Sequence, residues 1–197
     1  MGTTTFSGPV VSQNGFLGTI TGNVTGNVTG DVTGNVTGNV TGNVTGNLTG
    51  TVLATAPVNA TAATLAVTAA AHAGRVVTLN RAAGIAVTLP NATGTGAVYS
   101  FFVGTTITSN TTTIKVNRTA DTMAGTAYVV SDNAAAVLGY RTVTGGSASD
   151  TITLDGSTTG GLVGDIIRAT DVAANLYMVE VLTAATGTEA TPFSATV

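Results

Sequence analysis

The sequence contains no cysteine and no tryptophan, and only 8% of its 197 residues are charged. Without cysteine, the chain has no disulfide framework, thiolate nucleophile or thiolate metal site. Its single histidine, His72, excludes a metal site built from several imidazoles. Six basic residues against nine acidic ones give a net charge of −3, which disfavours nucleic-acid binding because that function needs a basic face. No apolar run approaches about 18 residues, so neither a transmembrane helix nor a membrane partner is expected.

Glycine and threonine, at 26 and 42 residues, take the place of the missing charge. Threonine is β-branched and favours the pleated surface of a sheet, so the composition predicts an all-β protein. Between Met1 and Gly74 the only formally charged side chain is Asp31, which indicates that this part is covered or paired. The opening residues lack the basic region and apolar stretch of a secretory signal.

A tetrapeptide repeat of the form TGNV runs from Thr21 to Val52. Glycine at every fourth residue excludes collagen, which needs it at every third. Glycine, asparagine, threonine and valine are poor helix formers, and a single aspartate excludes a calcium-binding β-roll. In a strand, valine and glycine share one face while threonine and asparagine share the other. The apolar positions, including one before the repeat, are Ile20, Val24, Val28, Val32, Val36, Val40, Val44, Leu48 and Val52.

A single ribbon of this repeat is not expected to be stable, because one aliphatic residue in four does not offset the backbone entropy of all four. Its edges would also stay unpaired. The simplest solution is association of identical chains, with three copies wound about one axis and the valines turned inward. The N-V-T triplets match the N-glycosylation pattern, but without an export signal we interpret them as a by-product of the repeat.

The Ala-rich segment 53–74 is predicted to be a transition, partly strand and with a short helix, and Pro57 ends the repeat. Beyond it, β-rich runs alternate with turn-rich spacers about every 8–12 residues, which is typical of a sandwich or barrel. We therefore predict a C-terminal β-sandwich over 75–197, with a jelly roll as the first choice. The expected strands cover 75–80, 85–89, 97–103, 112–117, 126–131, 140–143, 151–154, 165–169 and 177–182.

No catalytic motif is recognisable, since GxSxG, HExxH and a lysine-bearing phosphate loop are all missing. His72 lies in AAAHAG with no acid motif beside it, and we interpret it as a polar or interface histidine. Several carboxylates could include a glycan-hydrolysing pair, and Asp150 or Asp155 could bind calcium together with loop carbonyls. Aspartate is, however, a common turn residue, and no EF-hand spacing is present. These carboxylates are Asp150, Asp155, Asp165, Asp171, Glu180 and Glu189. We predict no catalytic residue, cofactor or metal.

The basic residues all lie in the C-terminal part and are interpreted as members of solvated or intersubunit ion pairs, each contributing about 0–1 kcal/mol when exposed. They are Arg75, Arg81, Lys115, Arg118, Arg141 and Arg168. The aromatic residues of this part are expected in the core or at a trimer interface, and an exposed cluster of them could bind a sugar. They are Tyr99, Phe101, Phe102, Tyr128, Tyr140, Tyr177 and Phe193.

Three parts of the chain resemble bacteriophage virion proteins. The segment VTGNVTGD, from Val24 to Asp31, resembles the octapeptide pattern of trimeric β-helices in phage spikes and fibres. The opening TTTFSGPVVSQNGF is similar to the N-termini of phage head decoration proteins and head fibres. A recurrent C-terminal domain of phage virion proteins looks similar to VVTLNRAAGIAVTLPNATGTGAVYSFFVG, TSNTTTIKV, SDTITLDGSTTGGLVGD and TGTEATPFSATV.

The resemblance implies a homotrimeric decoration (cement) or fibre protein on the exterior of a phage capsid, made in the host cytoplasm, with the major capsid protein as partner. Residues 1–17 would attach to the capsid, residues 18–52 would form an intertwined β-helix-like shaft, and the β-sandwich would be an exterior knob. The attachment candidates are Phe6, Pro9, Val10, Val11 and Phe16.

Two other functions stay open. The same architecture fits a tail fibre or spike whose knob binds a host glycan. A glycan depolymerase, with Asp150, Asp155 or Asp165 in its active site, is ranked last because such enzymes usually have longer chains with clear acid pairs. We therefore expect a protein that is not an enzyme.

Overall fold

The computed structural model describes residues 56–132, 136–145 and 148–197. The chain divides into two compact units, Met1–Leu48 and Thr49–Val197, and every described residue belongs to the second. The predictions for the shaft core and for capsid attachment therefore lie outside the described residues.

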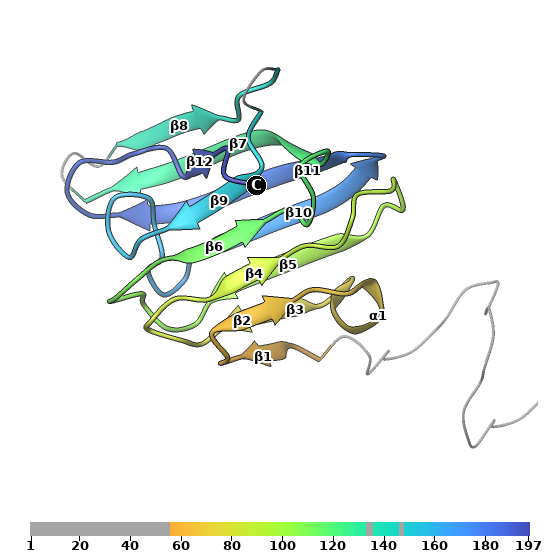
Figure 1. The fold of residues 1–197 in the computed structure, drawn as a ribbon. Coiled ribbons are helices and arrows are strands. Elements are labelled where there is room, and N and C mark those ends of the chain that lie inside the picture. Colours follow the sequence, from red (N-terminus) through yellow and green to blue (C-terminus); the bar gives the residue numbers. More distant parts are fainter. Residues whose placement is uncertain (1–55, 133–135, 146–147) are drawn as a thin grey trace, which may run out of the picture. The chain divides into compact units, whose positions relative to one another are not determined.

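The second unit is rich in β-structure, with two sheets that lie face to face (Figure 1). In chain order its elements are β1 (Val58–Ala60), β2 (Thr64–Ala66), α1 (Ala69–His72), β3 (Val76–Leu79), β4 (Ala86–Thr88), β5 (Val98–Val103), β6 (Thr112–Lys115), β7 (Thr122–Ser131), β8 (Val137–Arg141), β9 (Thr151–Leu154), β10 (Ile166–Ala173), β11 (Leu176–Ala185) and β12 (Phe193–Ser194). A seven-stranded sheet has the order β1-β3-β5-β10-β11-β7-β8, and a five-stranded sheet has the order β12-β9-β6-β4-β2.

The first six strands alternate between the two sheets, so the chain winds through three coils. In the seven-stranded sheet β1, β3 and β5 stack in parallel, and in the five-stranded sheet β2, β4 and β6 do the same. Parallel neighbours need a crossover connection, which each coil supplies through a strand of the opposite sheet. The Ala-rich segment contributes β1, β2 and α1, and thus the first coil.

The later strands extend both sheets mainly by antiparallel pairing. β10 pairs antiparallel with β5 and β11, and β9 does so with β6 and β12. β7 lies parallel to β11, and β8 closes that sheet as an antiparallel edge strand. The β-rich prediction is confirmed. The jelly-roll topology is wrong, because a jelly roll is an antiparallel architecture and five of the ten strand pairings in the described residues are parallel.

The core lies between the sheets, where alternate side chains of each strand meet. Across the seven-stranded sheet one register row faces inward and is fully buried: Val77, Phe101, Ile167, Val181 and Ala127. The five-stranded sheet supplies a facing row of Leu65, Val87, Ile114, Ile152 and Phe193. Tyr99 and Tyr177 also lie in the core, in edge-to-face contact at 6.4 Å between ring centroids.

Candidate interaction surface

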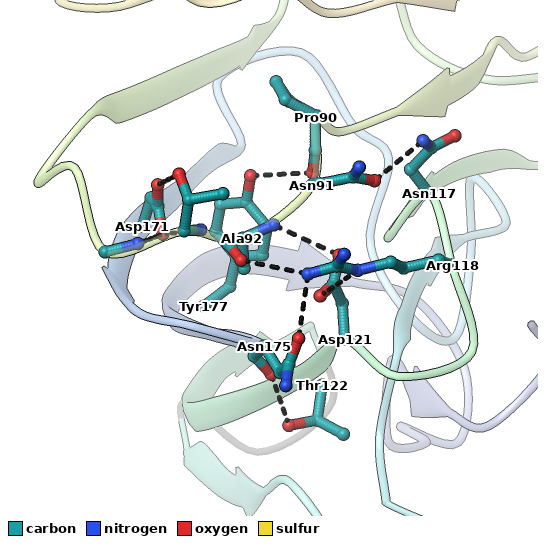
Figure 2. A network of polar contacts seen from close by, with 12 residues as sticks. Pro90, Asn91, Ala92, Asn117, Arg118, Asp121, Thr122, Asp171, Asn175 and Tyr177 are labelled. Carbon is teal, nitrogen blue, oxygen red and sulfur yellow. Dashed lines mark hydrogen bonds and ion pairs between the residues drawn. The ribbon is translucent and has the colours of Figure 1, made fainter.

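The carboxylate of Asp171, on β10, holds the loop that connects β4 to β5 (Figure 2). Its Oδ1 accepts hydrogen bonds from the backbone N–H groups of Thr93 and Gly94, at 2.9 and 2.7 Å. Its Oδ2 accepts the N–H and the hydroxyl of Thr95, at 3.0 and 2.7 Å, and the hydroxyl of Thr93 at 3.3 Å. Burial raises the pKa of Asp171, but these donors outweigh it and bring the pKa below its ordinary value.

Asp121 forms a second buried anchor beside this loop (Figure 2). Its carboxylate accepts the N–H of Ala92 at 3.1 Å and the Nε–H of Arg118 at 2.9 Å. Arg118 also donates to the carbonyl oxygen of Ala92 and to the side-chain oxygen of Asn175, at 3.2 and 2.8 Å. The ion pair therefore joins three connections, β4–β5, β6–β7 and β10–β11.

The hydroxyl of Tyr177 closes the same network by donating to the carbonyl oxygen of Pro90 at 2.9 Å (Figure 2). Burial, together with Tyr99, Asp171 and Asp121, raises the pKa of Tyr177. The phenol is thus held in its neutral form, in which it can donate this hydrogen bond.

Asp155 organises the turn that follows β9. It accepts the N–H groups of Ser157 and Thr159, at 2.8 and 3.0 Å, and the hydroxyl of Thr158 at 2.6 Å. Burial raises its pKa, but these hydrogen bonds lower it further, to about 2. The interpretation of Asp155 as a turn residue is confirmed by this geometry.

Asp165 and Asp150 likewise bind backbone N–H groups. Asp165 accepts those of Gly161, Leu162 and Ala184, at 2.6, 3.1 and 2.8 Å, and burial raises its pKa despite these bonds. Asp150 anchors the C-terminal tail instead of a turn, because it accepts the N–H groups of the last two residues at 2.8 and 3.1 Å. Each of these carboxylates stabilises the backbone around it.

Several other polar candidates have local partners as well. The ring of buried His72 lies within hydrogen-bond distance of the backbone of Thr68, which caps α1. Arg75 and Arg81 donate to backbone carbonyl oxygens rather than to carboxylates. Arg168 pairs with Glu180 at 3.6 Å. Among the described residues, no group of three or more potential ligands could hold a metal ion.

The outer face of the seven-stranded sheet carries a line of apolar side chains that the sequence did not identify as a group: Phe102 and Tyr128 were among the aromatics expected in the core or at a trimer interface, whereas Ile166 and Leu182 were not singled out. The register aligns Phe102, Ile166, Leu182 and Tyr128 on four adjacent strands, β5, β10, β11 and β7. The exposed fractions of the last three side chains are 48%, 55% and 51%, and that of Phe102 is intermediate. We call these four residues the apolar row.

A charged line runs beside the apolar row on the same face. In register it contains Val76, Ser100, Arg168, Glu180, Thr126 and Arg141, of which Arg168, Glu180 and Arg141 are charged. Both partners of the Arg168–Glu180 pair are half exposed. The two lines together border a shallow hollow of about 350 Å³, lined by Thr126, Tyr128, Ile166, Arg168, Glu180, Val181 and Leu182.

The outer face of the five-stranded sheet is different in character. Its strands present small or polar side chains there: Thr64, Ala66, Ala86, Thr88, Thr113, Lys115 and Thr153. Large exposed apolar residues are found on strands of the seven-stranded sheet and in loops, and on none of the described strands of the five-stranded sheet. The described domain therefore has one apolar and one polar sheet face.

Comparisons with family models, with curated proteins and with solved structures found no match. Within the part of the chain that the structure describes, no helix is long and apolar enough to cross a membrane.

Proposed function

We propose that this chain is a homotrimeric structural protein of a bacteriophage virion, bound to the outside of the capsid as a decoration or fibre protein. The TGNV repeat carries the proposal. Its apolar residues recur at every fourth position, and their burial requires partners that repeat in the same way, which identical chains supply. The phage-like segments in all three parts of the chain support the same role.

In this proposal the three parts of the chain have separate tasks. Residues 1–17 bind the major capsid protein, residues 18–52 form a trimeric shaft, and the C-terminal domain is an exterior knob. Three symmetric attachments act together, so each is allowed to be weak while the assembly stays bound. The capsid is stabilised where one trimer contacts several capsid subunits.

The hydrogen bonding of the carboxylates in the described domain supports a structural rather than a catalytic role. Asp121, Asp150, Asp155, Asp165 and Asp171 each accept hydrogen bonds from backbone N–H groups. These hydrogen bonds hold the backbone of the loops in place, which suits a protein that persists on a particle surface. We accordingly propose that the chain is not an enzyme.

Two measurements test the proposal. Sedimentation of the purified full chain is expected to give three times the monomer mass of 19.2 kDa, and a monomer at micromolar concentration would contradict it. Electron microscopy of virions, with an antibody against the C-terminal domain, is expected to label the head. Label confined to the tail would refute the capsid location.

A second candidate is a tail fibre or spike that binds a host glycan. Half-exposed Tyr128 favours it, because this ring lies at the hollow that Arg168 and Glu180 also line, and sugars bind aromatic faces beside polar groups. A glycan array separates the two functions: binding that is lost in Tyr128→Ala, together with tail labelling, would establish the second.

A further inference from the structure

The apolar row runs across four inner strands of its sheet, β5, β10, β11 and β7, and not along an edge strand. In the register of the seven strands it is flanked by Asn59 and Thr78 on one side and by Gly139 on the other. Three of its four side chains are about half exposed. Contiguous exposed apolar surface of this kind marks an interaction site in a soluble protein.

The exposed apolar residues are unevenly distributed over the domain. Eight of the ten large apolar side chains that are exposed in the described residues lie on strands of the seven-stranded sheet: Val76, Tyr128, Val130, Val137, Ile166, Val172, Met178 and Leu182. The corresponding face of the five-stranded sheet has none. One face of the domain therefore has the composition of an interface core, and the other that of a solvent-facing surface.

The sequence before the domain indicates which partner covers this face. Val52, the last apolar position of the repeat, lies only six positions before Val58, the first residue of β1. This stretch spans about 20 Å when fully extended. If the repeat forms the proposed trimeric shaft, this short connection keeps three copies of the domain at an effective local concentration of about millimolar or more. The strand that the chain enters first, β1, belongs to the sheet with the apolar face.

The charges on this face fit a second copy of the same chain. The line next to the apolar row contains Arg168 and Arg141 as well as Glu180. A surface with both signs can pair with an identical surface after rotation, whereas a surface of one sign repels its copies. A half-exposed ion pair beside an apolar centre also matches the usual arrangement of an interface, with a polar rim around an apolar core.

We propose that the outer face of the seven-stranded sheet is the contact between copies in the C-terminal domain. The apolar row packs around the three-fold axis against the rows of the other two copies, and the outer face of the five-stranded sheet points to solvent. This inference rests on the proposed trimer and adds the surface through which the knob itself associates. A glycan ligand on the same face is the competing explanation.

Cysteine cross-linking of the full chain tests the contact, because the native sequence contains no cysteine to interfere. Leu182→Cys places a thiol in the apolar row, and Ile166→Cys does so from the neighbouring strand in case the first variant folds poorly. Thr64→Cys is the control, because Thr64 is exposed on the outer face of the five-stranded sheet. Each variant is treated with a short bismaleimide and analysed on a denaturing gel, beside sedimentation of the untreated protein.

The proposal expects a trimer in which both apolar-row variants form covalent dimers at least tenfold more efficiently than Thr64→Cys. A trimer with equal, low cross-linking of all three variants overturns the inference and leaves the proposed trimeric function intact. A monomer overturns both. A fourth outcome is that the unmodified chain binds a glycan, that Leu182→Cys loses this binding, and that its cross-linking is as low as that of the control. This result overturns the contact and identifies the face as a ligand surface.

Discussion

Replacing Asp171 with asparagine removes a buried carboxylate that holds the loop between β4 and β5. One carboxylate oxygen accepts the N–H groups of Thr93 and Gly94, and the other accepts the N–H of Thr95. The side chain of asparagine has only one oxygen, so at least one of these backbone N–H groups faces another donor. Hydrogen bonds to a charged group contribute about 1.5–3 kcal/mol each, and water compensates part of the loss in this exposed loop. We therefore expect the free energy of unfolding to fall by about 2 kcal/mol.

Denaturant unfolding of the full chain, followed by circular dichroism, measures this change. All variants need the same protein concentration, because association shifts apparent stability. A loss of about 2 kcal/mol corresponds to a melting temperature lower by about 4–8 °C in a chain of this size. Asp132→Asn is the matched control, since Asp132 is exposed, and it is expected to change stability by less than about 0.5 kcal/mol. If Asp171→Asn matches this control, the carboxylate does not hold the loop.

Three further predictions follow from the fold. Gly156 has φ +80°, and an added Cβ would overlap the backbone carbonyl oxygen of Ile107. Gly156→Ala is therefore expected to lower the free energy of unfolding by more than about 1 kcal/mol, whereas Thr64→Ser, at an exposed position of the five-stranded sheet, should change it by less than about 0.5 kcal/mol. Equal midpoints of urea unfolding for the two variants would contradict the close approach of Gly156 to Ile107. Ile114→Ala, at a fully buried position between the sheets, is expected to cost about 2–5 kcal/mol, and calorimetry showing less than about 1 kcal/mol would mean that this core is not packed as described. The pKa of Asp155, about 2, lies below its ordinary 3.8, so its contribution is present above about pH 4 and is lost as the pH falls through about 2, by about 1 kcal/mol after solvent screening. The raised pKa of Asp165 acts in the opposite sense, because stability falls as the pH rises through that pKa. The test is the free energy of unfolding measured against pH: if Asp155→Asn loses as much stability in acid as the unmodified chain, the contribution assigned to Asp155 is disproved.

Strand positions were predictable because most strands alternate between apolar and polar residues. The expected strand 151–154 coincides with β9, and each of the other eight overlaps one strand from β3 to β11. The sequence did not predict the first coil, because β1 and β2 have only three residues each, VNA and TLA, and are too short to show a periodic pattern. Parallel and antiparallel strands have the same residue pattern here, so the sequence did not distinguish coils from a jelly roll.

The apolar face was harder to predict for a related reason. In β10 and β11, Ile166 stands next to Ile167 and Leu182 next to Val181. Apolar residues on both faces of a strand indicate burial on both sides, and this pairing is the signal that could have identified the row. The sequence grouped Tyr128 with Tyr177, whereas the former is half exposed and the latter fully buried. Which face of a strand points outward depends on the partner sheet, which the sequence does not specify.

The coiled path of the first six strands makes the size of this domain adjustable. Val58, Val77 and Phe101 are register partners on β1, β3 and β5. One coil therefore contains about 20 residues, which is within the usual length of a solenoid repeat. β1 and β2 are the outermost strands of their sheets at the end where the chain enters. Tandem duplication of one coil at that end would add a strand to each sheet and lengthen the domain by about 4.8 Å. Such a duplication would leave every existing neighbour in place, which gives evolution a simple way to produce longer or shorter versions.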